Sequence, residues 1–360
     1  MTNRFFTSLV VLLLGLTTLF AQGKSDAFRF SSVQFEYTTS YDDNVLRYSE
    51  RDIDRFEQNS EFHPSLLSTY DDWKNDFRLK LYFDGPLLYR KPLKIRYFGK
   101  FSSYYRNPFN NYASHTLLLY QELSRKVEID FKYFYIPGYY LREYDDRDLS
   151  EYHSCDFDDY QARFGVSAGI MKDLTVTFQT EFENIYYNEY FTEYDSENIF
   201  YDFGVSRRLG RNLRILFSYG FRISDNVGYI LAAPSAGGPG TAEDTEYGDS
   251  SYEEDVFAGE VRWRVGDFRG EWVNLSLEYK LRQRYYTTDN SLTSDPFHAG
   301  RADNRHRMTL QADRQISSKF DLGLNYTYEW RNVDSQDPTV VEIKEFSQNV
   351  FSLILTYKIW

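Results

Sequence analysis

The chain has little of what several functions require. Its 360 residues include one cysteine, Cys155, which excludes an intramolecular disulfide framework, a cysteine-rich zinc site and covalent c-type haem attachment. Its 41 basic residues are outnumbered by 54 acidic ones, which argues against sequence-independent nucleic-acid binding, since that needs a basic surface. Only one apolar run, near residues 5–20, approaches membrane length. A bundle of membrane-spanning helices is therefore excluded.

That apolar run has the organisation of a secretory signal peptide. Arg4 supplies a positive charge, residues 9–16 are apolar, and Ala21 offers a small residue before a cleavage site. We therefore predict a signal peptide over residues 1–21 and a single domain over residues 22–360. A membrane protein made from that domain would have to be a closed β-barrel, because the sequence contains no second long apolar run from which to form a helical span.

The remaining sequence is rich in aromatic residues, with 33 Tyr, 30 Phe and 5 Trp, although its mean hydropathy is −0.59. Apolar and polar residues alternate with a period of two, which predicts half-buried strands rather than helices. The apolar faces of the clearest segments contain no charged residue, whereas the opposite faces are rich in Lys, Arg, Asp and Glu. Lipid-facing strands require such segregation, because Arg or Lys near the bilayer midplane costs ~2–4 kcal/mol.

About 14 segments show this pattern, with the weakest signals in the fourth and twelfth. Long linkers alternate with short turns between them, as in barrels with long extracellular loops and short periplasmic turns. The predicted strands are 28–41, 73–84, 93–105, 115–123, 127–138, 160–171, 174–187, 198–209, 213–225, 256–266, 272–286, 303–316, 319–332 and 346–360.

All five tryptophans fall at segment ends, where amphipathic rings would mark the two membrane interfaces. They are Trp73, Trp263, Trp272, Trp330 and Trp360. At this point the chain resembles bacterial outer-membrane β-barrel proteins of the porin-like class. The resemblance implies an all-β, transmembrane, antiparallel up-and-down barrel in the outer membrane of a Gram-negative type bacterium. It also implies insertion by the barrel-insertion machinery through the C-terminal strand.

The charges are distributed unevenly. Loop 42–72 has nine acidic and three basic residues, and the other long loops are also acidic, whereas inward-facing positions carry many Arg and Lys. Charged linings select permeants by sign, so we predict a porin-like channel or passive transporter for small, anionic solutes, in which a basic wall faces a more acidic one. The predicted pore-lining residues are Lys80, Arg96, Lys100, Arg214, Arg222, Arg262, Arg264, Lys280, Arg282, Arg284, Arg305, Arg307, Glu128, Asp130, Glu181 and Glu183.

Two other classes of function remain open. The alternative reading is a non-conducting scaffold, adhesin or assembly and secretion partner that binds proteins through its long acidic loops. An enzyme is disfavoured, because the five histidines show no nucleophile elbow, phosphate loop or metal spacing around them. We therefore predict no catalytic residue, metal or cofactor. The expected partners are outer-membrane lipid and the insertion machinery, with a protein at the loops under the scaffold alternative, and no nucleic acid.

Overall fold

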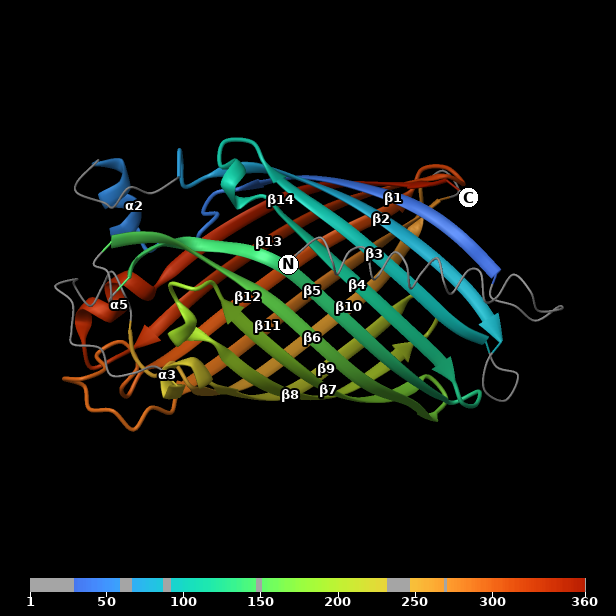
Figure 1. Ribbon diagram of the computed structural model, residues 1–360. Helices are drawn as coiled ribbons and strands as arrows, with labels where there is room; N and C mark the ends of the chain where they lie inside the picture. Colours follow the sequence, from blue (N-terminus) through green and yellow to red (C-terminus); the bar gives the residue numbers. More distant parts are fainter. Residues whose placement is uncertain are drawn as a thin grey trace, which may run out of the picture.

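The computed structural model describes residues 29–58, 67–86, 92–146, 151–231, 247–268 and 271–359. Within these ranges, strands β1 to β14 close into one antiparallel barrel (Figure 1), in which sequence neighbours pair and β1 pairs with β14. The strands are β1 (Arg29–Asp42), β2 (Asp72–Pro86), β3 (Pro92–Tyr104), β4 (Tyr112–Glu122), β5 (Val127–Asp146), β6 (Glu151–Met171), β7 (Leu174–Tyr187), β8 (Ser196–Leu209), β9 (Leu213–Asp225), β10 (Tyr252–Phe268), β11 (Glu271–Tyr286), β12 (Ala302–Gln315), β13 (Phe320–Asp334) and β14 (Phe346–Lys358).

This barrel confirms the predicted fold class and the predicted strand count. The predicted signal peptide at residues 1–21 and the last tryptophan, Trp360, lie outside the described residues. Their assignments therefore stay predictions.

The two faces of the cylinder have opposite polarity, as the alternation predicts. Tyr37, Phe77 and Phe101 are register partners across β1, β2 and β3. Phe77 and Phe101 are 40% and 48% exposed on the outer face. On the inner face, Glu36 accepts a hydrogen bond of 2.8 Å from the guanidinium of Arg78. The usual arrangement of a water-soluble protein is thus inverted, with apolar residues outside and charged residues inside.

The two ends of the barrel differ in their connections. Short turns join the strands at one end, and the longer loops at the other end carry helices α2 (Glu50–Glu57), α3 (Val227–Leu231) and α5 (Pro338–Lys344) (Figure 1). Two other loops at this end contain the 3-10 turns η2 (Pro108–Asn110), between β3 and β4, and η3 (Thr192–Tyr194), between β7 and β8. In the described part of the chain, no helix is both long enough and apolar enough to cross a bilayer.

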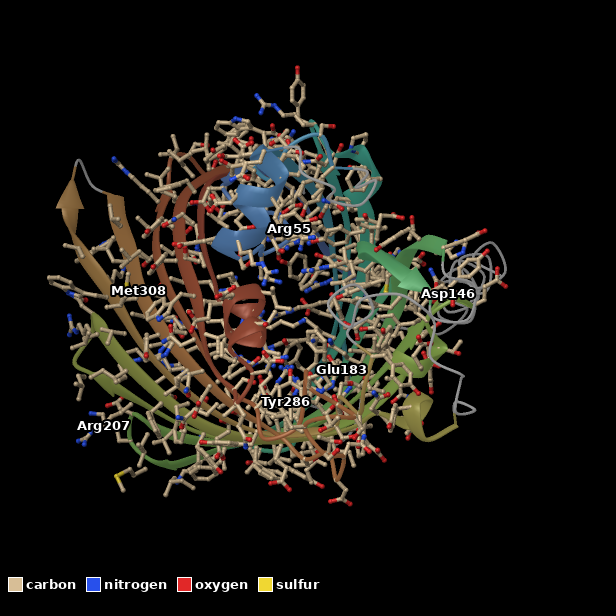
Figure 2. The ribbon with its side chains drawn as sticks, turned by 90° about the vertical axis from the view of Figure 1, so that its left-hand side faces the viewer. Arg55, Asp146, Glu183, Arg207, Tyr286 and Met308 are labelled. Atoms are coloured by element: carbon tan, nitrogen blue, oxygen red, sulfur yellow. The ribbon has the colours of Figure 1, made fainter. Side chains whose placement is uncertain are left out.

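The loops at the long-loop end are folded over the barrel rather than extended. In loop 43–71, Ser49 caps the N-terminus of α2, because its side chain accepts a hydrogen bond of 3.0 Å from the backbone N–H of Asp52. Arg51 of α2 lies 3.3 Å from Glu342 of α5. Figure 2 looks onto this end and shows both helices lying over the opening in the ring of strands.

One hairpin differs from the prediction. Residues 139–159 were expected to form a loop, but β5 continues to Asp146 and β6 begins at Glu151. Register shifts after Ile136 and Tyr140 break the alternation of apolar and polar residues in this hairpin. The extension is stabilised by a small apolar cluster, in which Tyr144, Cys155 and Phe191 are buried.

Candidate functional site: a charged lumen

The composition of the outer surface indicates which environment surrounds the barrel. Large apolar side chains stay exposed on twelve of the fourteen strands, all except β4 and β5, and Phe217, Leu324 and Phe351 are each at least 55% exposed. Such an apolar belt on a closed sheet needs hydrocarbon around it. The chain is an outer-membrane β-barrel. Its short-turn end therefore faces the periplasm and its long-loop end faces the outside.

Two of the four described tryptophans lie at strand ends, whereas Trp263 lies five residues before the end of β10. Trp73 is the second residue of β2, at the extracellular end, and Trp272 is the second residue of β11, at the periplasmic end. Trp73 and Trp263 are both 52% exposed. Trp330 lies near the extracellular end of β13, where its ring stacks on His306 with ring centroids 4.6 Å apart. An interface role for these rings stays a prediction.

Inside the barrel, Glu254 of β10 is a buried carboxylate, with 2% of its surface exposed. Arg282 and Arg284 of β11 both donate hydrogen bonds to it, over 2.7–2.9 Å and 3.1–3.2 Å. Both arginines lie on the same face of β11 because they are two residues apart, and their shared contact with Glu254 places that face toward the lumen. The guanidinium of Arg284 also lies over the ring of Tyr252, 3.6 Å from its centroid. One carboxylate therefore holds two guanidinium groups.

A second buried carboxylate, Glu329 of β13, holds three arginines. Arg305 donates a hydrogen bond of 2.7 Å to Glu329, and Arg307 approaches it at 3.7 Å, both from β12. The third is Arg47 of loop 43–71, whose Nε lies 3.2 Å from the carboxylate. Arg47 has a φ of 56°, in the left-handed region that non-glycine residues rarely adopt. The loop therefore reaches down into the mouth and joins the inner wall.

The next residue connects that loop to the far side of the opening. Tyr48 is buried, and its ring lies 5.4 Å from the guanidinium of Arg142 on β5. Strands β5 and β13 are separated by six steps around the fourteen-strand ring. Loop 43–71 therefore spans the extracellular mouth from one side to the other.

Two further carboxylates complete this arrangement. Asp303 accepts a hydrogen bond of 2.7 Å from Arg301 and lies 3.8 Å from Arg331. Glu183 of β7 accepts a hydrogen bond of 2.5 Å from Arg222 of β9. We call the whole set the mouth network, and its members are Arg47, Arg222, Arg282, Arg284, Arg301, Arg305, Arg307, Arg331, Glu183, Glu254, Asp303 and Glu329.

The mouth network carries an excess of positive charge. It has eight arginines and four carboxylates, so its formal charge is +4 when all are ionised. Each arginine nevertheless has a carboxylate within 4.0 Å. Shared carboxylates reduce the free energy required to hold so many buried cations together. The network can thus be ordered and electropositive at the same time.

The structure brings some of the predicted lining residues together and separates others. Arg222, Arg282, Arg284, Arg305, Arg307 and Glu183 belong to the mouth network. On the far wall, Lys80 contacts Glu36 (2.5 Å), Asp130 contacts Arg163 (3.3 Å) and Glu181 contacts Lys132 (3.7 Å). Arg96 and Lys100 lie against tyrosine rings. Lys280 pairs in register with Arg307, and Glu128 with Glu122 and Ser167. Arg214, Arg262 and Arg264 lie near the periplasmic end.

The prediction of a basic wall that faces a more acidic one is wrong for Glu183. Glu183 does not face Arg222 across the lumen but hydrogen-bonds to it from two strands away. Acidic residues also occur within the basic wall. The physical reason is that charges in a confined interior are stabilised by neighbours of opposite sign at hydrogen-bond distance.

The residues that sequence reasoning missed include Arg47, Glu254 and Asp303. The prediction began the tenth strand at residue 256, whereas β10 begins at Tyr252, so Glu254 was counted as part of an acidic loop. Extending the period-two pattern by one more inward position would have found it. Arg47 has no such signal, because its place depends on how a long loop folds back. Among the described residues, no group of three or more His, Cys, Asp or Glu side chains is arranged to hold a metal ion.

Comparisons with known proteins find similarity at the level of solved structures. No protein-family model and no curated protein matches the chain. An anion-selective porin from Comamonas acidovorans has a TM-score of 0.45 and 8% identity, covering 92% of this chain and all of the other. The outer membrane channel DcaP of Acinetobacter baumannii has a TM-score of 0.44 and 10% identity, covering 94% and 99% of the two chains. OprD of Pseudomonas aeruginosa has a TM-score of 0.41 and 12% identity, covering 91% and 94%.

Proposed function

We propose that the protein is a passive channel that admits small anionic solutes through the outer membrane. The observation that carries this proposal is the charge excess of the mouth network. Eight guanidinium groups share four carboxylates in the part of the lumen that a solute from outside meets first. A solute anion entering this region gains attraction that a cation does not, because a confined lumen focuses the field of its lining charges.

The size of the barrel supports a channel. The diameter of a closed sheet grows with its strand number, and eight strands already leave a core that side chains can fill. Fourteen strands enclose more space, and the charged inward side chains need water around them. The helices over the extracellular mouth restrict access, so the proposed solutes are small.

The direct experiment is electrical. Purified protein is inserted into a planar bilayer, and the reversal potential is measured across a tenfold KCl gradient. We expect discrete conductance steps and a reversal potential whose sign indicates preference for chloride. A protein that inserts without conducting would overturn the proposal, and would favour the alternative function as a scaffold that binds proteins through its loops.

A variant then tests the origin of the selectivity. Arg307 is suited to this test, because its side chain is 55% exposed and Glu329 keeps Arg305 and Arg47 when Arg307 is replaced. We expect Arg307→Gln to fold normally and to lower the anion-to-cation permeability ratio. The matched control is Lys172→Gln, which removes one exposed charge from the β6–β7 turn outside the lumen. Equal ratios in the two variants would contradict a role for the mouth network.

A further inference from the structure

A second set of arginines lies at the periplasmic end of the lumen, away from the mouth network. Arg208 of β8 is the register partner of Arg214 on β9, and Arg214 is the register partner of Arg262 on β10. Three arginines therefore stand side by side on three neighbouring strands. Arg264 follows two residues after Arg262 on the same inner face, and Arg211 lies in the β8–β9 turn. We call these five residues the periplasmic arginine row.

This arrangement is unfavourable unless something compensates for it. Residues directly opposite each other in an antiparallel pair have Cβ atoms about 4.5–5.5 Å apart, and like charges at such positions are destabilising. The row contains two like-charged pairs in succession. Arg262 is neutralised by Glu260 on its own strand. Arg208, Arg211, Arg214 and Arg264 make no ion pair with any carboxylate of the described residues.

The mouth network shows how the chain treats the same problem elsewhere. Arg282, Arg305 and Arg331 are also register partners in succession, on β11, β12 and β13. Each of them has a carboxylate within 4.0 Å, however. The periplasmic row has the same repetition of arginines, but only Arg262 has a carboxylate partner among the described residues. The contacts of Arg214 and Arg264 are neutral ones, with the hydroxyl of Ser206 at 2.9 Å and the ring of Trp272 at 4.8 Å.

The row lines a hollow in the inner wall. The hollow has a volume of about 590 Å³, and all five arginines of the row contribute to it. Its other polar lining residues include Glu260, Asp313, Asn274, Ser276 and Gln311. Asp313 already accepts a hydrogen bond of 2.7 Å from Gln311. Four guanidinium groups are therefore available to a ligand in a space large enough for a small solute.

We propose that the periplasmic arginine row is a binding site for a compact multivalent anion, whose negatively charged groups are of the phosphate or carboxylate class. Guanidinium groups bind both classes through paired, charge-assisted hydrogen bonds. Cross-strand neighbours at about 5 Å match a ligand that carries two or three charged groups close together. An acetate-sized anion would engage one arginine and leave the repulsion between the others unrelieved. A role of this site in anion permeation, as a binding site near the periplasmic exit, rests on the proposed channel function. Anion binding at the site does not depend on that function.

The test measures binding without any current. Protein is reconstituted in nanodiscs of zwitterionic lipid and titrated calorimetrically with pyrophosphate, citrate and acetate in low salt. We expect pyrophosphate and citrate to bind at least tenfold more tightly than acetate. The variant Arg208→Gln, Arg214→Gln, Arg264→Gln should lose at least tenfold in affinity for both multivalent anions. Undetectable binding by the unmodified protein, or an unchanged affinity in the variant, would overturn the proposal.

The control separates the site from general electrostatics. The control is a triple variant that also removes three positive charges, but from exposed turns at the same end of the barrel: Arg125→Gln, Lys126→Gln, Lys172→Gln. It should keep the affinity of the unmodified protein, and an equal loss in both variants would refute a defined site. The stability of the folded protein gives a second readout. Because the row is repulsive, Arg214→Gln should leave the unfolding midpoint unchanged or raise it, whereas a purely structural arginine would lower it.

The same anionic chemistry could be supplied by the headgroup of a phospholipid. Phospholipid that copurifies with the protein is quantified by mass spectrometry in the unmodified protein and in the row variant. Anionic lipid that is lost only in the row variant would support the site with a lipid as its occupant, whereas citrate binding in zwitterionic nanodiscs identifies a free solute. A barrel that binds citrate but carries no current would keep the site and refute the channel. A conducting barrel that binds none of these anions would refute the site alone.

Discussion

The arrangement around Glu254 makes a quantitative prediction about stability. Its carboxylate is 2% exposed and holds two guanidinium groups, Arg282 and Arg284, through four N–H···O contacts of 2.7–3.2 Å. The replacement Glu254→Gln keeps the shape of the side chain and removes its charge. Both arginines then stay close together without this counter-charge.

The expected cost follows from the burial of the three groups. Removing one partner from a buried ion pair costs about 3–5 kcal/mol. The side chains of Arg282 and Arg284 are 24% and 25% exposed, so water can solvate them in part. We therefore expect the lower end of that range, a loss of about 3 kcal/mol in the free energy of unfolding. The same change raises the net charge of the mouth network by one unit, so the proposed preference of the channel for anions should increase.

The assay is equilibrium urea unfolding of the protein in lipid vesicles, followed by tryptophan fluorescence. The matched control is Glu260→Gln, which makes the same substitution on the same strand and the same inner face. Glu260 pairs with Arg262, whose side chain is 54% exposed, so its loss should cost less than about 1 kcal/mol. If Glu254→Gln costs no more than Glu260→Gln, the reasoning that buried shared carboxylates stabilise the mouth network is refuted.

Three further predictions concern the extracellular end of the barrel. A Cβ on Gly228 of α3 would lie 2.0 Å from the backbone oxygen of Thr192 in η3. Gly228→Ala should therefore make the loop that carries α3 more sensitive to protease. The control is Gly259→Ala, whose Cβ meets nothing within 4 Å and which should not change this sensitivity. A hydrogen bond from Thr69 lowers the pKa of Asp71. The unfolded chain then binds more protons, so the stability difference between the unmodified protein and Asp71→Asn should be present at pH 7 and shrink below about pH 4, in urea titrations at both pH values. The buried thiol of Cys155 should resist maleimide until urea unfolds the barrel, and rapid labelling of the folded protein would contradict the observed packing.

The barrel itself could be predicted because its main signal is local. A strand that separates lipid from water must alternate between apolar and polar side chains. The sequence of a segment such as 213–225 therefore indicates that it is a strand, which of its faces is apolar and where it ends, without reference to the rest of the fold. The prediction failed where alternation is interrupted. In the β5–β6 hairpin, Gly138 has a φ of 56° and two register shifts follow within a few residues, so the apolar positions change phase while pairing continues.

The charged site could be predicted only in part, for a related reason. Alternation shows which residues face inward, and it therefore found Arg282 and Arg305. It does not show which inward residues meet, because that depends on the register between strands and on the tilt of the barrel. Arg47 shows the limit most clearly, since its contact with Glu329 joins residues 282 positions apart through a loop that carries no periodic pattern.

The two arginine sets should act differently on a passing anion because their counter-charges differ. In the mouth network a solute anion would have to compete with carboxylates such as Glu254 that are already within hydrogen-bond distance, so the proposed channel should hold anions only weakly at its mouth. At the periplasmic arginine row no carboxylate of the described residues forms an ion pair with Arg208 or Arg214, so a multivalent anion should be held more tightly there. A channel conducts only when each site releases what it binds. If the protein is a channel, the affinity of the row must therefore stay below the level at which the ligand would block the exit, and the neutralisation of Arg262 by Glu260 favours this by lowering the charge of the row.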